Sequence, residues 1–303
     1  MVYNTRALHY FGTFDDRALV EPARYAGHGA GYAESALVND TIGSVHTGLN
    51  MSELASGGTL LPHLHSYEEG FYILFGRAIV SIGSRSYLLG PGDFGAVKVG
   101  TPHGWRNAGG EPVRWLQMAA PQPKPSPSTA PGASQMRDTF FLPNRSMPSD
   151  APPLNPANTQ GDLLGHFDLG QIPRGDEGRI TGGGLQGVFL KWMIDEKLGA
   201  RHHRMLFIEY QPGVSIGLHD HTFEESYFIL SGEVEATLDG RKYLARAGNV
   251  LWTGVGCVHA FANVGSEPVR WLETFSPQPP AENVFRFVAE WEQLAKELEG
   301  QAT

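Results

Sequence analysis

The sequence predicts an all-β protein of two tandem, jelly-roll-like β-barrels followed by one C-terminal amphipathic helix. The first observation behind this prediction is an internal repeat. The block from residue 36 to 123 recurs 156 residues later (219 − 63 = 156 for one matched histidine pair) without insertion or deletion. The second is the pattern inside each copy, where short runs of alternating apolar and polar residues are separated by glycine, proline and aspartate turns.

The two copies match at chemically distinctive positions. His63-Leu64-His65 corresponds to His219-Asp220-His221, and the run from Glu111 to Leu116 returns unchanged from Glu267 to Leu272. Two copies of one folding unit are the simplest explanation. Parallel α/β folds would need helices between the strands, and the repeats show no helical period.

One segment of each copy has a clear hairpin pattern. Residues 78–89 read AIVSIGSRSYLL, with Gly83 at the turn. The matching residues 234–245 read VEATLDGRKYLA, and their Asp239-Gly240 dipeptide is strongly favoured in two-residue hairpin loops. Each copy is therefore predicted to be a barrel of antiparallel strands.

The repeats set the expected domain boundaries. Residues 36–123 form the first barrel and 189–280 the second, with a Pro- and Gly-rich interdomain crossing at 124–188. Residues 281–300 are predicted to form the helix, because their apolar side chains fall on one helical stripe and Gly300 suits its end.

Composition narrows the classes of function. The chain has 303 residues, enough for two cores, and its net charge of −9 argues against nucleic acid as a partner. Apolar runs all fall short of the roughly 20 residues of a membrane span, and the first residues lack the apolar core of a signal peptide. The expected location is the cytoplasm. The single cysteine, Cys257, is expected to be a buried, inert thiol.

Two sets of four residues carry the predicted chemistry. His63 and His65 are two apart on a strand and so share a face, with Glu69 across a short turn and His103 on a later strand. Three imidazoles and one carboxylate suit a divalent transition metal, with Fe(II) or Mn(II) favoured and Ni, Cu or Zn also suitable. Open coordination positions would remain for catalysis. The second copy repeats the set with His219, His221, Glu225 and His259.

These residues belong to two longer motifs. The first has the form Gly-x5-His-x-His-x3-Glu-x6-Gly and is met by Gly57, His63, His65, Glu69 and Gly76, and again by Gly213, His219, His221, Glu225 and Gly232. The second, Pro-x-Gly-x2-His-x3-Asn, is met by Gly100, His103 and Asn107, and by Gly256, His259 and Asn263, although Lys98 and Gly254 replace its proline. Both copies thus resemble the cupin superfamily, which implies two cupin barrels with a metal ion in each.

The chain looks most like bicupin dioxygenases of the quercetinase-like kind. That resemblance implies an oxidoreductase that uses O₂ on a small organic substrate, with Glu69 or Glu225 as general base. Oxalate decarboxylases usually carry an arginine shortly before the His-x-His. This chain has Leu60, Leu61 and Pro62 there, and Ile216, Gly217 and Leu218 in the second copy, so the sequence argues against that alternative. Ureidoglycine aminohydrolases, with a different ligand order, and non-catalytic small-molecule-binding cupins are the further alternatives.

Aromatic residues are predicted on the interior faces of the barrels. Phe71 and Trp105 in the first copy, and Tyr227 and Phe261 in the second, are candidates for a substrate pocket, with barrel core as the alternative role. Glu68 and Glu224, beside the candidate ligands, are expected to face solvent. A homo-oligomer is compatible with the sequence, although one chain already contains a pair of barrels.

Overall fold

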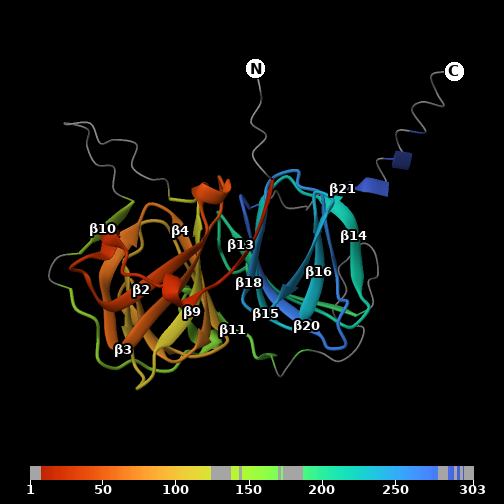
Figure 1. The fold of residues 1–303 in the computed structure, drawn as a ribbon. Coiled ribbons are helices and arrows are strands. Elements are labelled where there is room, and N and C mark those ends of the chain that lie inside the picture. The colour runs from red at the N-terminus through yellow and green to blue at the C-terminus, as the bar shows by residue number, and fades with distance from the viewer. Residues whose placement is uncertain are drawn as a thin grey trace, which may run out of the picture.

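The computed structural model describes residues 8–123, 138–142, 145–169, 172, 187–278, 286–289, 292–293 and 296. They form two β-barrels that lie side by side, the first coloured red to yellow and the second cyan to blue in Figure 1. The described helical elements that have assigned bounds are four short 3-10 turns: η1 (Asp16–Ala18), η2 (Ala23–Tyr25), η3 (Asp40–Ile42) and η4 (Pro156–Asn158). The predicted all-β class and tandem cupin barrels are confirmed.

The first barrel is one continuous curled sheet. Its strands are β2 (Gly29–Val38), β3 (Gly48–His65), β4 (Glu68–Phe75), β5 (Ala78–Ile82), β6 (Arg85–Leu89), β7 (Asp93–Val97), β8 (His103–Asn107), β9 (Val113–Ala120), β10 (Thr139–Phe141) and β11 (Leu163–His166). The long β3 joins the two layers because its first part pairs with β9 and its last part with β8. The residues predicted as interdomain crossing thus contribute β10 and β11 to this sheet.

The second barrel consists of two separate sheets. Its strands are β12 (Val188–Ile194), β13 (Arg204–Tyr210), β14 (Ser215–Asp220), β15 (Glu224–Ser231), β16 (Glu233–Leu238), β17 (Arg241–Arg246), β18 (Asn249–Thr253), β19 (His259–Ala262), β20 (Val269–Ser276) and β21 (Arg286–Phe287). The counterpart of β3 is broken here into β13 and β14. Most of the predicted helix at 281–300 lies outside the described residues, and β21 pairs with β14.

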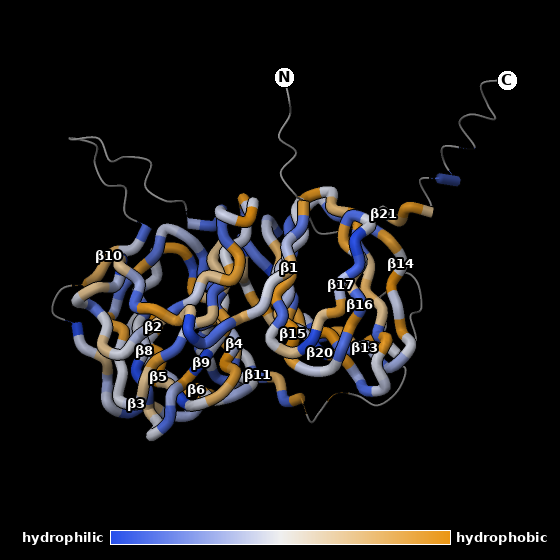
Figure 2. The backbone as a smooth tube through the Cα atoms, in the orientation of Figure 1, coloured by the Kyte–Doolittle hydropathy of each residue, from blue (hydrophilic) through white to orange (hydrophobic). Residues whose placement is uncertain are grey.

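One edge strand of each barrel comes from the segment that directly precedes the other barrel in the sequence. β1 (His9–Thr13) lies ahead of the first barrel in sequence but pairs with β18 of the second. β11 precedes the second barrel but pairs with β7, the counterpart of β18, in the first. Figure 2 shows β1 among the strands of the second barrel. The two barrels therefore exchange strands reciprocally.

Three large apolar clusters stabilise the molecule, and a fourth, small one contains Ile79, Met147 and Ala151. One fills each barrel, centred on Trp115 in the first and Trp271 in the second. The third lies between the barrels, where Met51 and Met118 of the first share a cluster with Phe207 and Trp252 of the second. Alternating residues of the facing sheets thus serve the barrel interior and the interface between barrels.

The motif glycine at the end of β4 and of β15 is required by close packing. Gly76 and Gly232 both have positive φ, +79° and +76°. A Cβ on Gly76 would lie 2.4 Å from the carbonyl oxygen of Pro112, and one on Gly232 would lie 2.5 Å from that of Pro268. Any side chain here would collide with the backbone and adopt an unfavourable conformation.

Glu68 and Glu224 do not face solvent, so that expectation is wrong. Glu68 is 1% exposed and accepts hydrogen bonds from the backbone amides of Arg201 and His202 in the second half of the chain. Its carboxylate also lies 2.7 Å from the imidazole of His203. Burial raises the pKa of Glu68, but His203 and these amides outweigh it and hold the pKa below its ordinary value.

Glu224 makes the reciprocal contact with the first half. Its carboxylate, 3% exposed, accepts hydrogen bonds from the hydroxyl of Ser44 and the amides of Val45, His46 and Thr47, at 2.7 to 3.1 Å. Residues 44–47 and 200–203 are themselves counterparts in the repeat. In each barrel, the glutamate directly before the candidate ligand glutamate therefore binds a loop of the other barrel.

Among the described residues, the structure contains no helix long and apolar enough to cross a membrane.

Candidate metal centres

The structure brings each set of three histidines together inside its barrel. His63 and His65 come from β3 and His103 from the adjacent β8, where His63 and His103 are direct cross-strand partners. The candidate ligand nitrogens of the three lie within 4.8 Å of one another, and all three residues are buried. A register shift between Leu60 and His63 bends β3 just before the pair. The second barrel repeats this arrangement with His219, His221 and His259.

Hydrogen bonds to the outer ring nitrogens orient the imidazoles. Nδ1 of His63 lies 2.8 Å from the carbonyl oxygen of Leu61, and Nδ1 of His103 lies 3.0 Å from that of Thr101. A carbonyl oxygen accepts only, so Nδ1 carries the proton and Nε2 keeps its lone pair. This is the tautomer that a metal ligand needs. His219 and His259 make the same contact, with the carbonyl oxygens of Gly217 and Cys257.

The third histidine of the first set is held by a strand from outside the repeat. Nδ1 of His65 lies 3.1 Å from the hydroxyl of Thr139 on β10. That hydroxyl donates its own proton to the carboxylate of Asp138, at 2.9 Å, and therefore accepts from His65. Thr139 belongs to the segment that the sequence indicated only as a crossing, so no pattern pointed to it.

The first set leaves buried polar atoms that a cation would satisfy. Glu69 places one carboxylate oxygen 3.2 Å from Nε2 of His65 and 3.5 Å from Nε2 of His103. Both nitrogens, and the other oxygen of Glu69, are buried without a hydrogen-bond partner among the described residues. Buried polar atoms are normally paired. Three nitrogen donors and a carboxylate that converge in this way fit a divalent transition metal.

Electrostatics favour the metal-binding forms of His63, Glu69 and His219. Burial, followed by the charges of His103 and His65, lowers the pKa of His63 well below its usual value, so this imidazole is neutral. Burial raises the pKa of Glu69, but the neighbouring imidazoles outweigh it and hold the pKa well below the ordinary range. In the second barrel, burial and the other two imidazoles lower the pKa of His219 to about 4. Neutral imidazoles and an ionised carboxylate are the required ligand forms.

The second set has a tyrosine in direct contact with its ligands. Glu225 lies 3.4 Å from Nε2 of His221 and 3.2 Å from Nε2 of His259. The hydroxyl of Tyr227 donates a short hydrogen bond to the carboxylate of Glu225 and lies 3.3 Å from Nε2 of His259. Phe71 occupies the matching position in the first barrel and has no hydroxyl to offer.

The residue behind the ligand glutamate also differs between the barrels. In the first, Gln117 donates a hydrogen bond from its amide nitrogen to Glu69, at 2.8 Å. Its counterpart Glu273 accepts a hydrogen bond from the indole of Trp271 at 3.0 Å. Burial, together with the charge of Glu225, raises the pKa of Glu273 well above its ordinary value. Gln117 is the only polar residue in the run WLQMAA at 115–120, a signal that could have identified it from the sequence, whereas Glu273 is followed by Thr274 and Ser276 and has no such signal.

A row of polar side chains in contact connects Glu69 to an arginine near the surface of the first barrel. Ser52 donates to Gln117 at 2.9 Å and lies 3.1 Å from the hydroxyl of Tyr32. Tyr32 donates to Glu34 at 3.1 Å, and the guanidinium of Arg24 binds Glu34 at 2.6 Å. Ile208 replaces the serine in the second barrel, so the same connection is missing there.

Aromatic rings surround the first set at one end of the barrel. Tyr25 lies 5.4 Å from the ring of His63, Tyr67 stacks on His65 at 4.3 Å, and Phe141 lies 5.4 Å from His63. The Tyr25 hydroxyl is buried without a hydrogen-bond partner among the described residues, and the guanidinium of Arg24 lies 4.8 Å from its ring centre. Tyr25 and Arg24 precede the repeat, so sequence matching could not indicate them.

The four predicted pocket residues are all buried in the barrel cores. Phe71 and Trp105 contact each other edge to face at 4.9 Å, and Tyr227 and Phe261 pack at 4.8 Å. That they line a substrate pocket stays a prediction, whereas the structure shows that they pack in the barrel cores.

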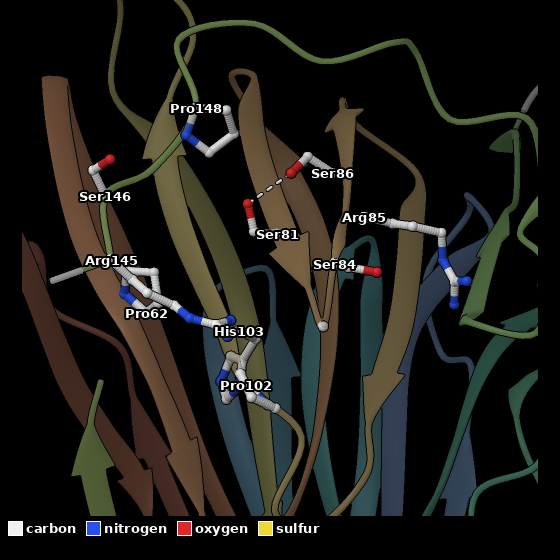
Figure 3. Close-up of a pocket in the computed structure, with 11 residues that line it drawn as sticks. Pro62, Ser81, Ser84, Arg85, Ser86, Pro102, His103, Arg145, Ser146 and Pro148 are labelled. Atoms are coloured by element: carbon white, nitrogen blue, oxygen red, sulfur yellow. Dashed lines mark hydrogen bonds between the residues drawn. The ribbon is translucent and has the colours of Figure 1, made fainter. Parts of the chain in front are cut away.

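A polar cavity of about 390 Å³ lies beside the β5–β6 hairpin and reaches His103 (Figure 3). Ser81 and Ser86 line it and are joined by a hydrogen bond of 2.8 Å across the hairpin. Arg145, which is exposed, contributes a positive charge. The cavity places hydrogen-bonding groups and a cation next to one histidine of the first set.

Comparison with known families decides the classification. The Cupin domain family model matches residues 50–118 and 206–275, one match in each barrel. The chain is a bicupin. Solved bicupins share its architecture across nearly its whole length. The Lactobacillus farciminis oxalate decarboxylase formate complex superposes with a TM-score of 0.63 and 16% identity, over 93% of this chain and 89% of that one.

Curated relatives match only part of the bicupin. The polyketide synthase CurC of Streptomyces cyaneus is 34% identical over 71 residues, 23% of this chain and 46% of that protein. The oxalate-binding protein of Thermotoga maritima is 39% identical over 62 residues, 20% of this chain and 51% of that protein. The chain thus spans about half the length of these relatives. Their names differ in function, as expected of a fold that serves many chemistries.

Proposed function

We propose that this bicupin is a metal-dependent decarboxylase that acts on a small carboxylic acid in its first barrel. The observation that carries the proposal is the combination of Arg24 and the unpartnered Tyr25 hydroxyl beside the buried set of His63, His65, His103 and Glu69. The likeness to oxalate decarboxylases and to an oxalate-binding protein supports a carboxylate substrate. Arg24 supplies, from η2, the cation that the residues directly before His63 lack.

The metal would be held by His63, His65, His103 and Glu69, with Mn(II) or Fe(II) favoured for this mixed nitrogen and oxygen set. When bound, such an ion acts as a Lewis acid on a substrate oxygen. Arg24, with a positive charge at the same end of the barrel, would attract and orient the substrate carboxylate. Gln117 would hold Glu69 in place through its hydrogen bond.

Tyr25 is the proposed proton donor. Decarboxylation breaks one carbon–carbon bond, releases CO₂ and leaves the electron pair on the retained carbon, which must then take a proton. Burial raises the pKa of the Tyr25 hydroxyl, so it holds its proton at neutral pH. Solvent would restore that proton after release of the products. Glu69 is ionised and has no proton to give.

Dioxygenation is the second candidate. The rings of Tyr25, Tyr67 and Phe141 near the metal set suit a planar aromatic substrate, and Glu69, or Glu225 in the second barrel, would accept its hydroxyl proton. The position of Arg24 and Tyr25 beside the first set favours the decarboxylase. The cytoplasmic location and any homo-oligomer stay predictions.

The test measures CO₂ release and O₂ consumption by the Mn(II)- or Fe(II)-loaded protein on oxalate, small keto acids, phenolic acids and flavonols. The proposal expects CO₂ from a small acid without matching O₂ loss. Tyr25→Phe and Arg24→Gln should each lower that rate at least about 10-fold. Arg17→Gln, at an exposed arginine paired with Asp15, is the matched control. Stoichiometric O₂ consumption would instead establish the dioxygenase, and full activity of both variants would overturn the roles given to Arg24 and Tyr25.

A further inference from the structure

We propose that His9, Asp239 and Cys257 form a third metal site, separate from the two histidine sets, that binds a zinc-like divalent cation and fastens β1 to the second barrel. The site does not depend on the function proposed for the first barrel. Its three residues come from β1, from the β16–β17 hairpin and from the turn before β19. They are far apart in the sequence but adjacent in the fold.

The donor atoms of the three residues converge. A ring nitrogen of His9, a carboxylate oxygen of Asp239 and the sulfur of Cys257 lie within 4.8 Å of one another. The closest pair is His9 Nδ1 and Asp239 Oδ2, at 3.1 Å. Donor atoms around a tetrahedral zinc ion lie about 3 to 4 Å apart, as follows from bond lengths of about 2.0 to 2.3 Å, so only small movements would be needed.

Neighbouring groups already hold the imidazole and the carboxylate in place. A carboxylate only accepts, so Nδ1 of His9 donates to Asp239, and the hydroxyl of Tyr243, 3.0 Å from Nε2, donates to that nitrogen. A cation would take the place of the Nδ1 proton, and Tyr243 would then accept a proton from Nε2. The other oxygen of Asp239 accepts a hydrogen bond from the amide of Val258 at 3.2 Å. An outer partner for each ligand is the usual support of a metal site.

Burial distinguishes this cluster from an accidental surface group. Cys257 is fully buried, and the side chain of His9 is 8% exposed although it lies on an edge strand. Asp239, at 32%, gives the site an opening to solvent, and through it a water could complete the coordination. Phe11 stacks on Tyr243 at 4.8 Å and covers the other side.

The matching place in the first barrel shows that these donors are not a feature of the fold. Gly83 stands where the second barrel has Asp239, and Thr101 where it has Cys257. Tyr87, the counterpart of Tyr243, donates to Asp162 just before β11, and Arg85 pairs with the same carboxylate. An ordinary ion pair thus anchors the exchanged strand of the first barrel, whereas the second has nitrogen, oxygen and sulfur donors.

This donor set selects a borderline-soft cation. Thiolate and imidazole favour Zn(II) or Co(II) over Mg(II) or Ca(II), and three protein ligands with one water are typical of accessible zinc sites. Binding would take Cys257 as thiolate and release its proton to solvent. The ion would then crosslink three segments, with β1 held at its first residue.

The experiment uses Co(II), because thiolate-to-cobalt charge transfer gives a near-ultraviolet band that imidazole and carboxylate ligands do not. Cys257 is the only cysteine of the chain, so the band reports on this site alone. The full-length protein is titrated with Co(II) while absorbance and bound metal are measured. We expect the band to appear, to be displaced by Zn(II), and to persist in the double variant His65→Ala/His221→Ala.

His9→Ala should weaken Co(II) binding at this site at least about 10-fold, and Asp239→Asn should do the same. His166→Ala is the matched control, because His166 lies on the exchanged strand β11 and pairs with Asp93. Cys257→Ser should abolish the band, and His9→Ala serves in its place if that variant does not fold. Absence of the band at saturating Co(II), or a band unchanged by both His9→Ala and Asp239→Asn, would overturn the proposal.

Discussion

The two barrels have the same fold and the same set of candidate metal ligands, but they differ in the residues that contact the ligand glutamate. In the first, Gln117 donates to Glu69 and accepts from Ser52, which contacts Tyr32 nearer the surface. In the second, Tyr227 binds Glu225, and Glu273, whose pKa burial raises well above its ordinary value, occupies the position of the glutamine. The first carboxylate is thus fixed by a neutral amide, and the second by a phenol next to another carboxyl group. A duplicated site has kept its donors while its supporting residues diverged.

Removal of one histidine from each barrel gives the largest expected difference. His65→Ala should lose about one equivalent of metal and nearly all activity, because a missing ligand costs more than the roughly 100-fold of a missing support. His221→Ala should lose the other equivalent yet keep the proposed activity. Metal analysis and CO₂ release measure both. Equal loss of activity would show that the barrels do not divide the work as we propose.

The reciprocal carboxylates provide the next test. Glu68→Ala and Glu224→Ala should each lower the free energy of unfolding by about 3 kcal/mol, because buried amides of the opposite barrel lose their acceptor. Denaturant unfolding of the metal-loaded protein measures this loss. An effect within about 0.5 kcal/mol, typical of an exposed residue, would contradict the interface role.

The supports of the ligand glutamates should differ in metal affinity. Gln117→Leu should weaken metal binding in the first barrel about 10- to 100-fold, because Glu69 loses its hydrogen bond. Glu273→Leu should not weaken the second site, because its carboxyl accepts a hydrogen bond from Trp271 instead of contacting Glu225. Competition with a chelator reports both affinities. Equal weakening would mean that Glu273 supports Glu225 after all.

The smallest expected effect concerns a single methyl group. A Cβ on Gly70 would lie 2.2 Å from Nε2 of His203, so Gly70→Ala should cost about 1 to 3 kcal/mol through overpacking. Its counterpart is Ser226, whose hydroxyl lacks a hydrogen-bond partner among the described residues, so Ser226→Ala should cost far less. Thermal unfolding of the pair measures the contrast, and similar costs would show that His203 moves aside easily.

The sequence could predict the barrels and the donors because both are repeated and strictly spaced. His63 and His65 share a face at any register of a strand, and the same pattern in the second copy excludes chance. The burial of Glu68 could not be predicted. Strand alternation places Glu68 and Glu69 on opposite faces of the sheet, but it does not show that the second barrel covers the face of Glu68. Arg24, Tyr25 and Thr139 reach the first set from outside the repeat, where only the tertiary fold reveals proximity.

The exchange of β1 and β11 has a consequence for how this chain arose. Each half, expressed alone, would carry one exchanged strand without its partner and one sheet edge without its covering strand. Both features favour self-association. Two copies of an ancestral single barrel would have avoided this by exchanging these strands in a twofold dimer. Head-to-tail fusion of the two genes would then keep the strand exchange within one polypeptide and allow each copy to diverge separately. The exchanged strands would also hold the two halves together if the chain between them were cut.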